Sequence, residues 1–133
     1  MYEIFTVQSH RFAVEDDVLF IVYVGVFEIA HTEQMIATAE RIFQKHHRVF
    51  LLSDVTRSAA LPAESRKRFV QWYSQDGFSA LANFGADLTT RTVGTLALNA
   101  VRVLHRKHIP FTFVKTESEA RSFIAAQRRI LAS

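Results

Sequence analysis

The sequence contains no cysteine, and this absence excludes several kinds of site. Disulfides, thiolate metal sites and catalysis by a cysteine nucleophile all need that residue. Glycine is also scarce, at four of 133 residues, so little backbone is free to wrap around a phosphate. The G-x-S-x-G, G-x-x-x-x-G-K-[ST] and G-x-G-x-x-G motifs do not occur. The sequence therefore argues against the enzyme classes that use these motifs, and we expect no cofactor.

Long apolar segments are missing as well. The longest apolar run, VLFIVYV at 18–24, has only about a third of the length of a membrane-spanning helix. The first ten residues, MYEIFTVQSH, have neither a basic leader nor an extended apolar stretch, which argues against a signal peptide. We therefore expect a cytoplasmic protein without a membrane span. Its length and its 49% hydrophobic content fit a single domain over residues 1–133.

The charge balance gives little reason to expect a nucleic-acid partner. The net charge of +3 comes from 16 basic and 13 acidic residues. The densest basic stretch, RVLHRKH at 102–108, stands at the end of an expected helix, where cations complement the helix dipole. Nucleic-acid binding more often shows a basic stripe with interleaved aromatic residues.

Hydrophobic periodicity predicts an antiparallel start. Residues 2–7 and 11–14 resemble two short strands, and the acidic residues at 15–17 fit a turn before the next strand. Residues 18–24 are apolar without alternation, as in a strand that is covered on both faces. This pattern is typical of a central strand in a parallel sheet.

The rest of the sequence alternates between helical and strand patterns. Four helices are expected, with Thr32 as N-cap of the first, Pro62 as first residue of the second, and a Thr116/Glu119 capping box at the start of the fourth. The third helix is expected to bury a face of apolar residues, namely Val93, Ala97, Ala100, Val101 and Leu104. The strands between these helices are expected at 48–55, 79–84 and 111–116.

This order predicts an α/β fold. The elements follow as β-β-β-α-β-α-β-α-β-α, with an N-terminal antiparallel meander and then a mostly parallel sheet. The helices are expected to pack on the sheet.

Ser53 and Asp54 are candidate site residues, because they come at the expected exit of the strand at 48–55. Ligands of open α/β sheets often lie at the carboxyl ends of the strands. An aspartate after a buried strand also commonly caps or turns the backbone, however. The structural interpretation is the better supported of the two.

Four aromatic residues form a second candidate site around the expected second helix: Phe69, Trp72, Tyr73 and Phe78. Such clusters are most often plain core. They can instead line an apolar pocket or a dimer face. A contact surface of this kind would be completed by an apolar ligand or by a second subunit.

Metal binding is not expected. His105 and His108 stand three residues apart on one helix, but the local sequence offers no third ligand. His46 and His47 end the first helix in a position that suits the dipole. The acidic residues at 15–17 are read as exposed turn residues.

The runs LFIVYVGVF, HTEQMIATAERIF and RVFLLSDVTRSAALPAESRKRFVQWY, together with the element order, resemble the SpoIIAA-like branch of the STAS domains. That branch is also compared with the Sec14 (CRAL-TRIO) fold. The resemblance covers nearly the whole chain and implies a non-enzymatic module. It further implies pairing as a homodimer and the holding of non-polar ligands.

Anti-sigma factor antagonists of this family are switched by phosphorylation of a serine that follows an aspartate. In this sequence the matching segment reads LPAESRK, with Glu64 before Ser65, so the motif is altered. At the start of a helix, Ser65→Asp is expected to leave folding nearly unchanged.

The leading hypothesis is a small regulatory or carrier protein that binds a non-polar ligand or a protein partner. A phosphorylation-switched antagonist with Ser65 as phosphoacceptor is the alternative, and an enzyme of unknown type comes third.

Overall fold

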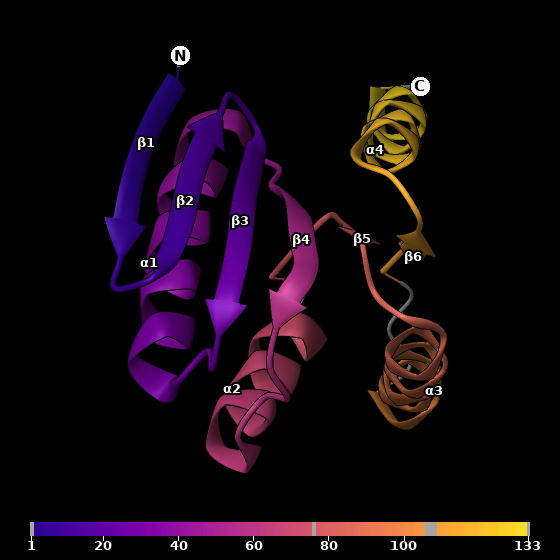
Figure 1. Cartoon of the computed structure of the whole chain (residues 1–133). Coiled ribbons are helices and arrows are strands. Elements are labelled where there is room, and N and C mark those ends of the chain that lie inside the picture. The colour runs from indigo at the N-terminus through magenta and orange to yellow at the C-terminus, as the bar shows by residue number, and fades with distance from the viewer. Residues whose placement is uncertain (1, 76, 106–108, 133) are drawn as a thin grey trace.

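The structure is a computed structural model that describes residues 2–75, 77–105 and 109–132 (Figure 1). Six strands form one sheet in the order β1-β2-β3-β4-β5-β6. The strands span Tyr2–Val7 (β1), His10–Glu15 (β2), Val18–Gly25 (β3), Phe50–Ser58 (β4), Ala80–Phe84 (β5) and Phe111–Val114 (β6). The helices of the described residues span Ile29–His46 (α1), Ala63–Ser74 (α2), Leu88–His105 (α3) and Glu117–Ala132 (α4). None of these helices is long and apolar enough to cross a membrane.

The sheet begins with an antiparallel meander, as the sequence predicts. β1 pairs with β2, and β2 with β3, in antiparallel register. Gln8 and Asp16 adopt the left-handed conformation in the two tight turns, with φ values of 56° and 55°. From β3 onward each strand pairs in parallel with the next.

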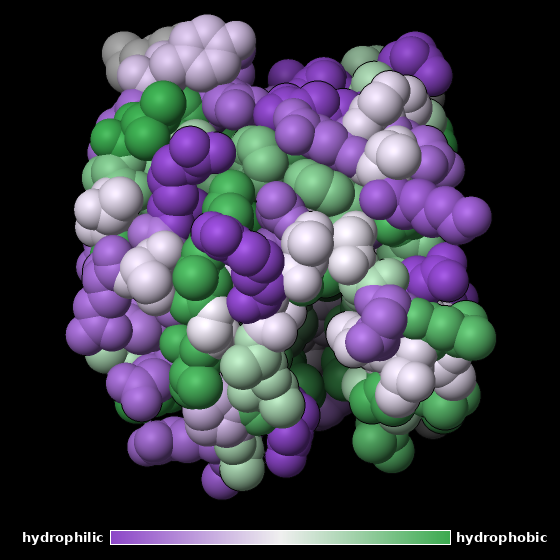
Figure 2. All heavy atoms as spheres, in the orientation of Figure 1, coloured by the Kyte–Doolittle hydropathy of each residue, from purple (hydrophilic) through white to green (hydrophobic). Residues whose placement is uncertain are grey.

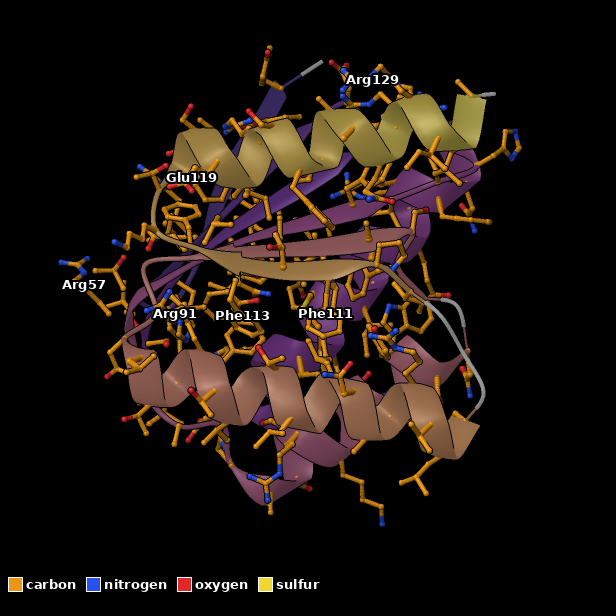
Figure 3. All side chains as sticks on the ribbon, turned by 90° about the vertical axis from the view of Figure 1, so that its right-hand side faces the viewer. Arg57, Arg91, Phe111, Phe113, Glu119 and Arg129 are labelled. Carbon is orange, nitrogen blue, oxygen red and sulfur yellow. The ribbon has the colours of Figure 1, made fainter. Side chains whose placement is uncertain are left out.

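The topology decides which face each helix covers. Parallel strands joined by right-handed crossovers, and added always on the same side, place every crossover helix on one face. α1, α2 and α3 accordingly share one face of the sheet, while α4, which follows the last strand, covers the other (Figures 1 and 3). Figure 3 shows the sheet between α4 above and α3 below.

The first four residues of β3 and of β4 are buried on both faces, and the two strands pair in parallel, which confirms the predicted central strand at 18–24 in a mostly parallel sheet. Leu19, Ile21 and Leu51 point into the core under α1, α2 and α3. Phe20 and Leu52 point into the core under α4. The absence of alternation in these runs follows from this two-sided burial.

Several element boundaries differ from the prediction, and three of them have a clear cause in the structure. α1 begins at Ile29 with Glu28 as N-cap, because Glu28 and His31 form a reciprocal capping box. Thr32 is buried one turn later, and its Oγ1 donates to the Glu28 carbonyl. β4 continues to Ser58, since beyond a register shift its last residues still pair with Val24 and Gly25 of β3. Pro62 is the N-cap of α2, which begins at Ala63.

The predicted buried face of α3 is correct for Val101 and wrong for Val93 and Leu104. Leu98 and Val101 are the buried residues of this helix, while Val93 is 61% and Leu104 78% exposed. Apolar residues surround α3 on all sides, so their spacing alone does not identify the face that meets the sheet. In Figure 2 apolar side chains accordingly gather on the surface at the lower right, where Figure 1 places α3.

Candidate functional site

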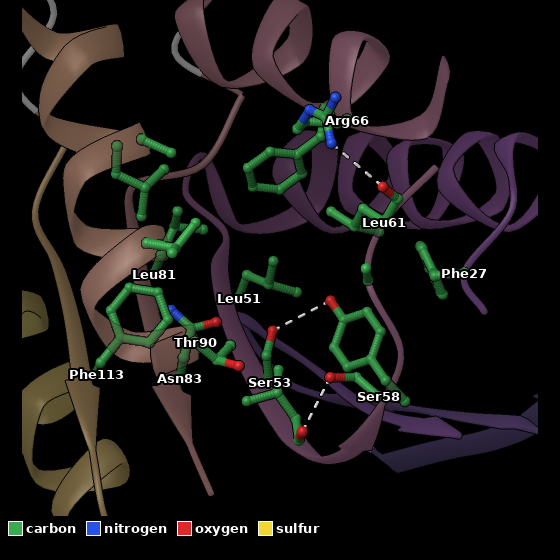
Figure 4. Close-up of a pocket in the computed structure, with 18 of the residues that line it drawn as sticks. Phe27, Leu51, Ser53, Ser58, Leu61, Arg66, Leu81, Asn83, Thr90 and Phe113 are labelled. Carbon is green, nitrogen blue, oxygen red and sulfur yellow. Dashed lines mark hydrogen bonds between the residues drawn. The ribbon is translucent and has the colours of Figure 1, made fainter. Parts of the chain in front are cut away.

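An apolar cavity of about 450 Å³ lies between the sheet and helices α2 and α3. This volume falls in the range of small-molecule binding sites. Side chains of β4, β5 and β6 form its floor, including Leu51, Leu81 and Phe113 (Figure 4). Phe69 and Val70 of α2 and the buried face of α3 form its walls.

Small residues keep the cavity open. Gly94 and Ala97 of α3 line it, as do Ala59 and Ala60 of the segment before α2. At Gly94 the helix rests on the ring of Phe113, where an added Cβ would come within 2.5 Å of Cζ. The residues on either side of this contact are too short to fill the space between helix and sheet, so a cavity remains.

A polar group lies in the middle of the apolar floor. Ser53 of β4 pairs in register with Asn83 of β5, so their side chains are neighbours on the same face of the sheet. The Tyr23 hydroxyl lies 3.2 Å from Ser53 Oγ, within hydrogen-bond distance. Burial raises the pKa of Tyr23 to about 12, although the hydrogen bond to Ser53 acts in the opposite direction. Tyr23 therefore stays neutral and keeps its proton at physiological pH.

One cationic residue lines the cavity. Arg66 is exposed, and its Nη1 donates to the Leu61 carbonyl at 3.4 Å. Figure 4 shows Arg66 and Leu61 on the α2 side, away from Ser53 and Asn83 on the floor. Ser58 also lines the cavity, but its Oγ already donates to the Val55 carbonyl at 2.9 Å.

The structure separates the two residues that the sequence predicts at a strand exit. Ser53 lies inside β4, not at its end, and it faces the cavity. Asp54 points to the opposite side of the strand, and its Oδ1 accepts hydrogen bonds from the Thr56 backbone N–H and hydroxyl. Asp54 thus holds the local backbone and does not line the cavity.

Ser65, the candidate phosphoacceptor, is fully buried. Its Oγ has no hydrogen-bond partner in the part of the chain that the structure describes. This burial removes the basis for expecting that Ser65→Asp leaves folding unchanged, because a carboxylate at this position would lose its water without gaining a partner. A kinase could reach Ser65 only if the start of α2 moved.

The four aromatic residues do not form one contact surface. Tyr73 and Phe78 are buried in the core, and the Tyr73 hydroxyl donates to the Ile109 carbonyl at 2.9 Å. Trp72 is half-buried against Gly77, and its Nε1 has no hydrogen-bond partner among the residues that the structure describes. Of the four, only Phe69 lines the cavity. The core interpretation therefore holds for Tyr73 and Phe78.

The acidic turn at 15–17 has a structural role. Asp17 is almost fully buried and accepts from Arg48 at 2.6 Å and from Arg128 at 2.7 Å. Burial opposes ionisation of Asp17, but the hydrogen bonds from the two guanidinium groups outweigh it, so the pKa lies below its usual value. Glu15 likewise forms an ion pair with Arg121. The Glu15–Arg121 and Asp17–Arg128 ion pairs connect α4 to the antiparallel meander.

Within the described residues no three histidine, cysteine or acidic side chains are placed to hold a metal ion. His105 ends α3, whereas His108 lies outside the described residues.

Sequence reasoning missed Tyr23 and Asn83, which share the cavity floor with Ser53. A signal for both exists, because each is a polar residue within an otherwise apolar strand. Such a residue either meets a buried partner or faces a cavity.

The family models and the curated protein sequences give no match to this chain. Solved structures do. The chain is similar to a crystal structure of an uncharacterized DUF3478-family protein with a SpoIIAA-like fold from Shewanella loihica PV-4. The TM-score is 0.61 at 17% identity, over 92% of this chain and 91% of the other.

The anti-sigma factor antagonist SpoIIAA in its unphosphorylated form is also similar. Its TM-score is 0.57 at 11% identity, over 94% of this chain and 98% of that one. The two likenesses confirm the SpoIIAA-like fold that the sequence resemblance implies.

Proposed function

We propose that this protein is a non-enzymatic carrier or regulatory module that binds an apolar small molecule in the cavity between the sheet and helices α2 and α3. The observation that carries the proposal is the cavity itself, whose walls are apolar and whose volume suits a small molecule. Apolar surface that lines a cavity of this size favours binding of an apolar molecule, because such binding removes the surface from water.

The polar groups of the cavity support binding over catalysis. Ser53 has a hydrogen bond with Tyr23 and none with a histidine or a carboxylate among the described residues. A serine nucleophile needs such a base beside it. Tyr23 keeps its proton and cannot act as that base near neutral pH.

A switch through Ser65 has less support. The serine is buried, and the acidic neighbour in the sequence is Glu64 where the family has aspartate. Similarity to an anti-sigma factor antagonist concerns the fold alone at 11% identity.

A neutral apolar dye, N-phenyl-1-naphthylamine, tests ligand binding directly. Its fluorescence should rise on addition of the protein. Ala97→Trp places an indole at a position that lines the cavity and should reduce dye binding about tenfold or more. Ala100→Trp is the matched control, since Ala100 lies one turn further along α3 and does not line the cavity.

The proposal would be wrong if the wild type does not bind the dye, or if both tryptophan variants bind it as well as the wild type. Native mass spectrometry of the freshly purified protein adds an independent measurement, since it detects a retained small molecule.

A second proposal concerns the oligomeric state of the protein. The outward side of α3 carries large apolar residues that are more than half exposed: Leu88, Leu96, Val103 and Leu104. Both arginines of the helix, Arg91 and Arg102, lie partly buried, so among the described residues this side of α3 presents mainly apolar side chains. Two such surfaces are self-complementary around a two-fold axis. We propose that a second copy of this chain covers α3 in a homodimer.

A further inference from the structure

The floor of the cavity has unused hydrogen-bonding capacity in one place. Ser53 and Asn83 are register partners on β4 and β5, and the Tyr23 hydroxyl reaches Ser53 from β3. The neighbours along the same row are apolar, with Ile21 on one side and Phe113 on the other. Three polar side chains therefore meet in the middle of an apolar surface (Figure 4).

Asn83 presents an acceptor to the cavity. Its Nδ2 donates to the Thr112 carbonyl at 3.2 Å. A backbone carbonyl can only accept, so this bond fixes which end of the amide is nitrogen. The Oδ1 lies on the other end, and no described residue donates a hydrogen bond to it. A ligand that satisfies Asn83 must therefore bring a donor.

Tyr23 and Ser53 present a donor. They have two hydroxyl protons between them and share one hydrogen bond, at 3.2 Å. Whichever hydroxyl donates in that bond, the other keeps a proton that can be donated elsewhere. A ligand that satisfies this pair must bring an acceptor close to the donor that Asn83 requires.

An anionic group does not fit this place. A carboxylate has no proton to donate to the Asn83 side-chain oxygen, so the two oxygens would repel each other. The carboxylate would also lose its hydration in an apolar cavity. Arg66, the one cation among the described residues that line the cavity, is exposed and lies on the α2 side (Figure 4).

We infer that the ligand is an apolar molecule with one neutral group that both donates and accepts a hydrogen bond, of which a hydroxyl is the simplest, and that this group lies between Ser53 and Asn83. The inference rests on the proposed function and names the chemical class of its ligand. Ser53, Tyr23 and Asn83 are then the residues that select the ligand, while the aliphatic walls bind the rest of it.

Displacement of N-phenyl-1-naphthylamine by dodecanol, dodecyl methyl ether and dodecanoate tests the inference. The three compounds share a chain length and differ at the polar end. Dodecanol should displace the dye at a concentration about tenfold lower than the ether, which lacks the donor, because a buried acceptor left unpaired weakens binding by about this factor or more. Dodecanoate at neutral pH should also be weaker than dodecanol.

Two variants of Asn83 connect the preference for the alcohol to this residue. Asn83→Leu and Asn83→Ala should each bring dodecanol and the ether to within about twofold of one another, because both remove the acceptor that the ether leaves unpaired. Ser58→Ala is the matched control, since Ser58 lines the cavity but its hydroxyl is already bonded to Val55, so the preference should persist. Circular dichroism establishes that the variants are folded, and Asn83→Ala remains informative if Asn83→Leu does not fold.

Equal displacement by all three compounds in the wild type would overturn the inference but would not contradict the proposed function as a carrier of apolar molecules. Tightest displacement by dodecanoate that is lost in Arg66→Gln would also overturn it, because the polar end would then lie at Arg66. Failure of the dye and of every compound to bind would overturn both the inference and the proposed function.

Discussion

At the scale of single residues, Ser65 shows how much burial changes the effect of one substitution. The residue lies in the first turn of α2, where an acidic side chain normally suits the helix dipole. Its side chain is nevertheless fully buried without a partner. The cost of burying a charge is larger than the benefit of the dipole.

Ser65→Asp should therefore lower the free energy of unfolding by about 3 kcal/mol or more, as measured by urea denaturation. Ser65→Ala is the control and should change it by less than about 1 kcal/mol, because the hydroxyl that it removes has no partner. Near-equal stability of the aspartate variant and the wild type would show that the side chain reaches water.

His10 is a second residue whose surroundings set a testable property. It is fully buried, its Nδ1 accepts from the Val24 N–H, and its Nε2 donates to the Val26 carbonyl, both at 3.0 Å. Only the neutral ring can make both bonds. Burial lowers the pKa of His10 below its ordinary 6.5, nearby His31 lowers it further, and the bond to Val26 opposes both.

Because the folded pKa of His10 is lowered, the unfolded chain binds the proton more readily. The contribution of His10 to stability should be complete above about pH 6.5 and fall as the pH drops below that value, by at most about 1.4 kcal/mol per pH unit. Urea denaturation between about pH 7.5 and 5.5 measures this slope. His10→Gln should reduce the slope, whereas His47→Asn, at an exposed position at the end of α1, should leave it unchanged. Identical slopes in wild type and His10→Gln would contradict the assignment.

At the scale of elements, α3 differs from the other helices. It rests on β6 where Gly94 meets Phe113. The opposite side exposes large apolar residues, with Leu96 at 65%. Exposed apolar surface of this extent on one helix is typical of a contact with another molecule.

If a second copy covers α3, the protein should sediment as a dimer at micromolar concentration. Leu96→Glu should shift it to the monomer, since it places two like charges near the two-fold axis. Ile130→Glu on α4 is the control, because Ile130 is similarly exposed at 62% but lies on the other face of the sheet. A wild type that sediments as a monomer at every concentration would contradict the homodimer.

At the scale of the whole molecule, strand order determines where a ligand can bind. Because β3 to β6 are added in sequence order, all three crossover helices must share one face. α4 covers the other face, where Phe20, Leu52 and Ile124 belong to a separate hydrophobic core. The cavity thus lies on the face that α1, α2 and α3 cover, where small residues of α3 leave space between the helix and the sheet.

The sequence by itself determined the order of the elements, the antiparallel start and the two central parallel strands. These features depend on local periodicity and on apolar runs such as 18–24. The lack of alternation in such a run already indicates that both faces of the strand are buried. It also singled out Ser53, although for its expected place at the end of the strand.

Only the tertiary structure decided the site. Tyr23, Ser53 and Asn83 come from three strands and become neighbours through register, which no local pattern encodes. Burial of Ser65 and exposure of Val93 and Leu104 likewise depend on how each helix is rotated against its neighbours. A helix that is apolar on all sides, or that begins beside the core, does not specify this rotation in its own residues, because it results from packing against the rest of the chain.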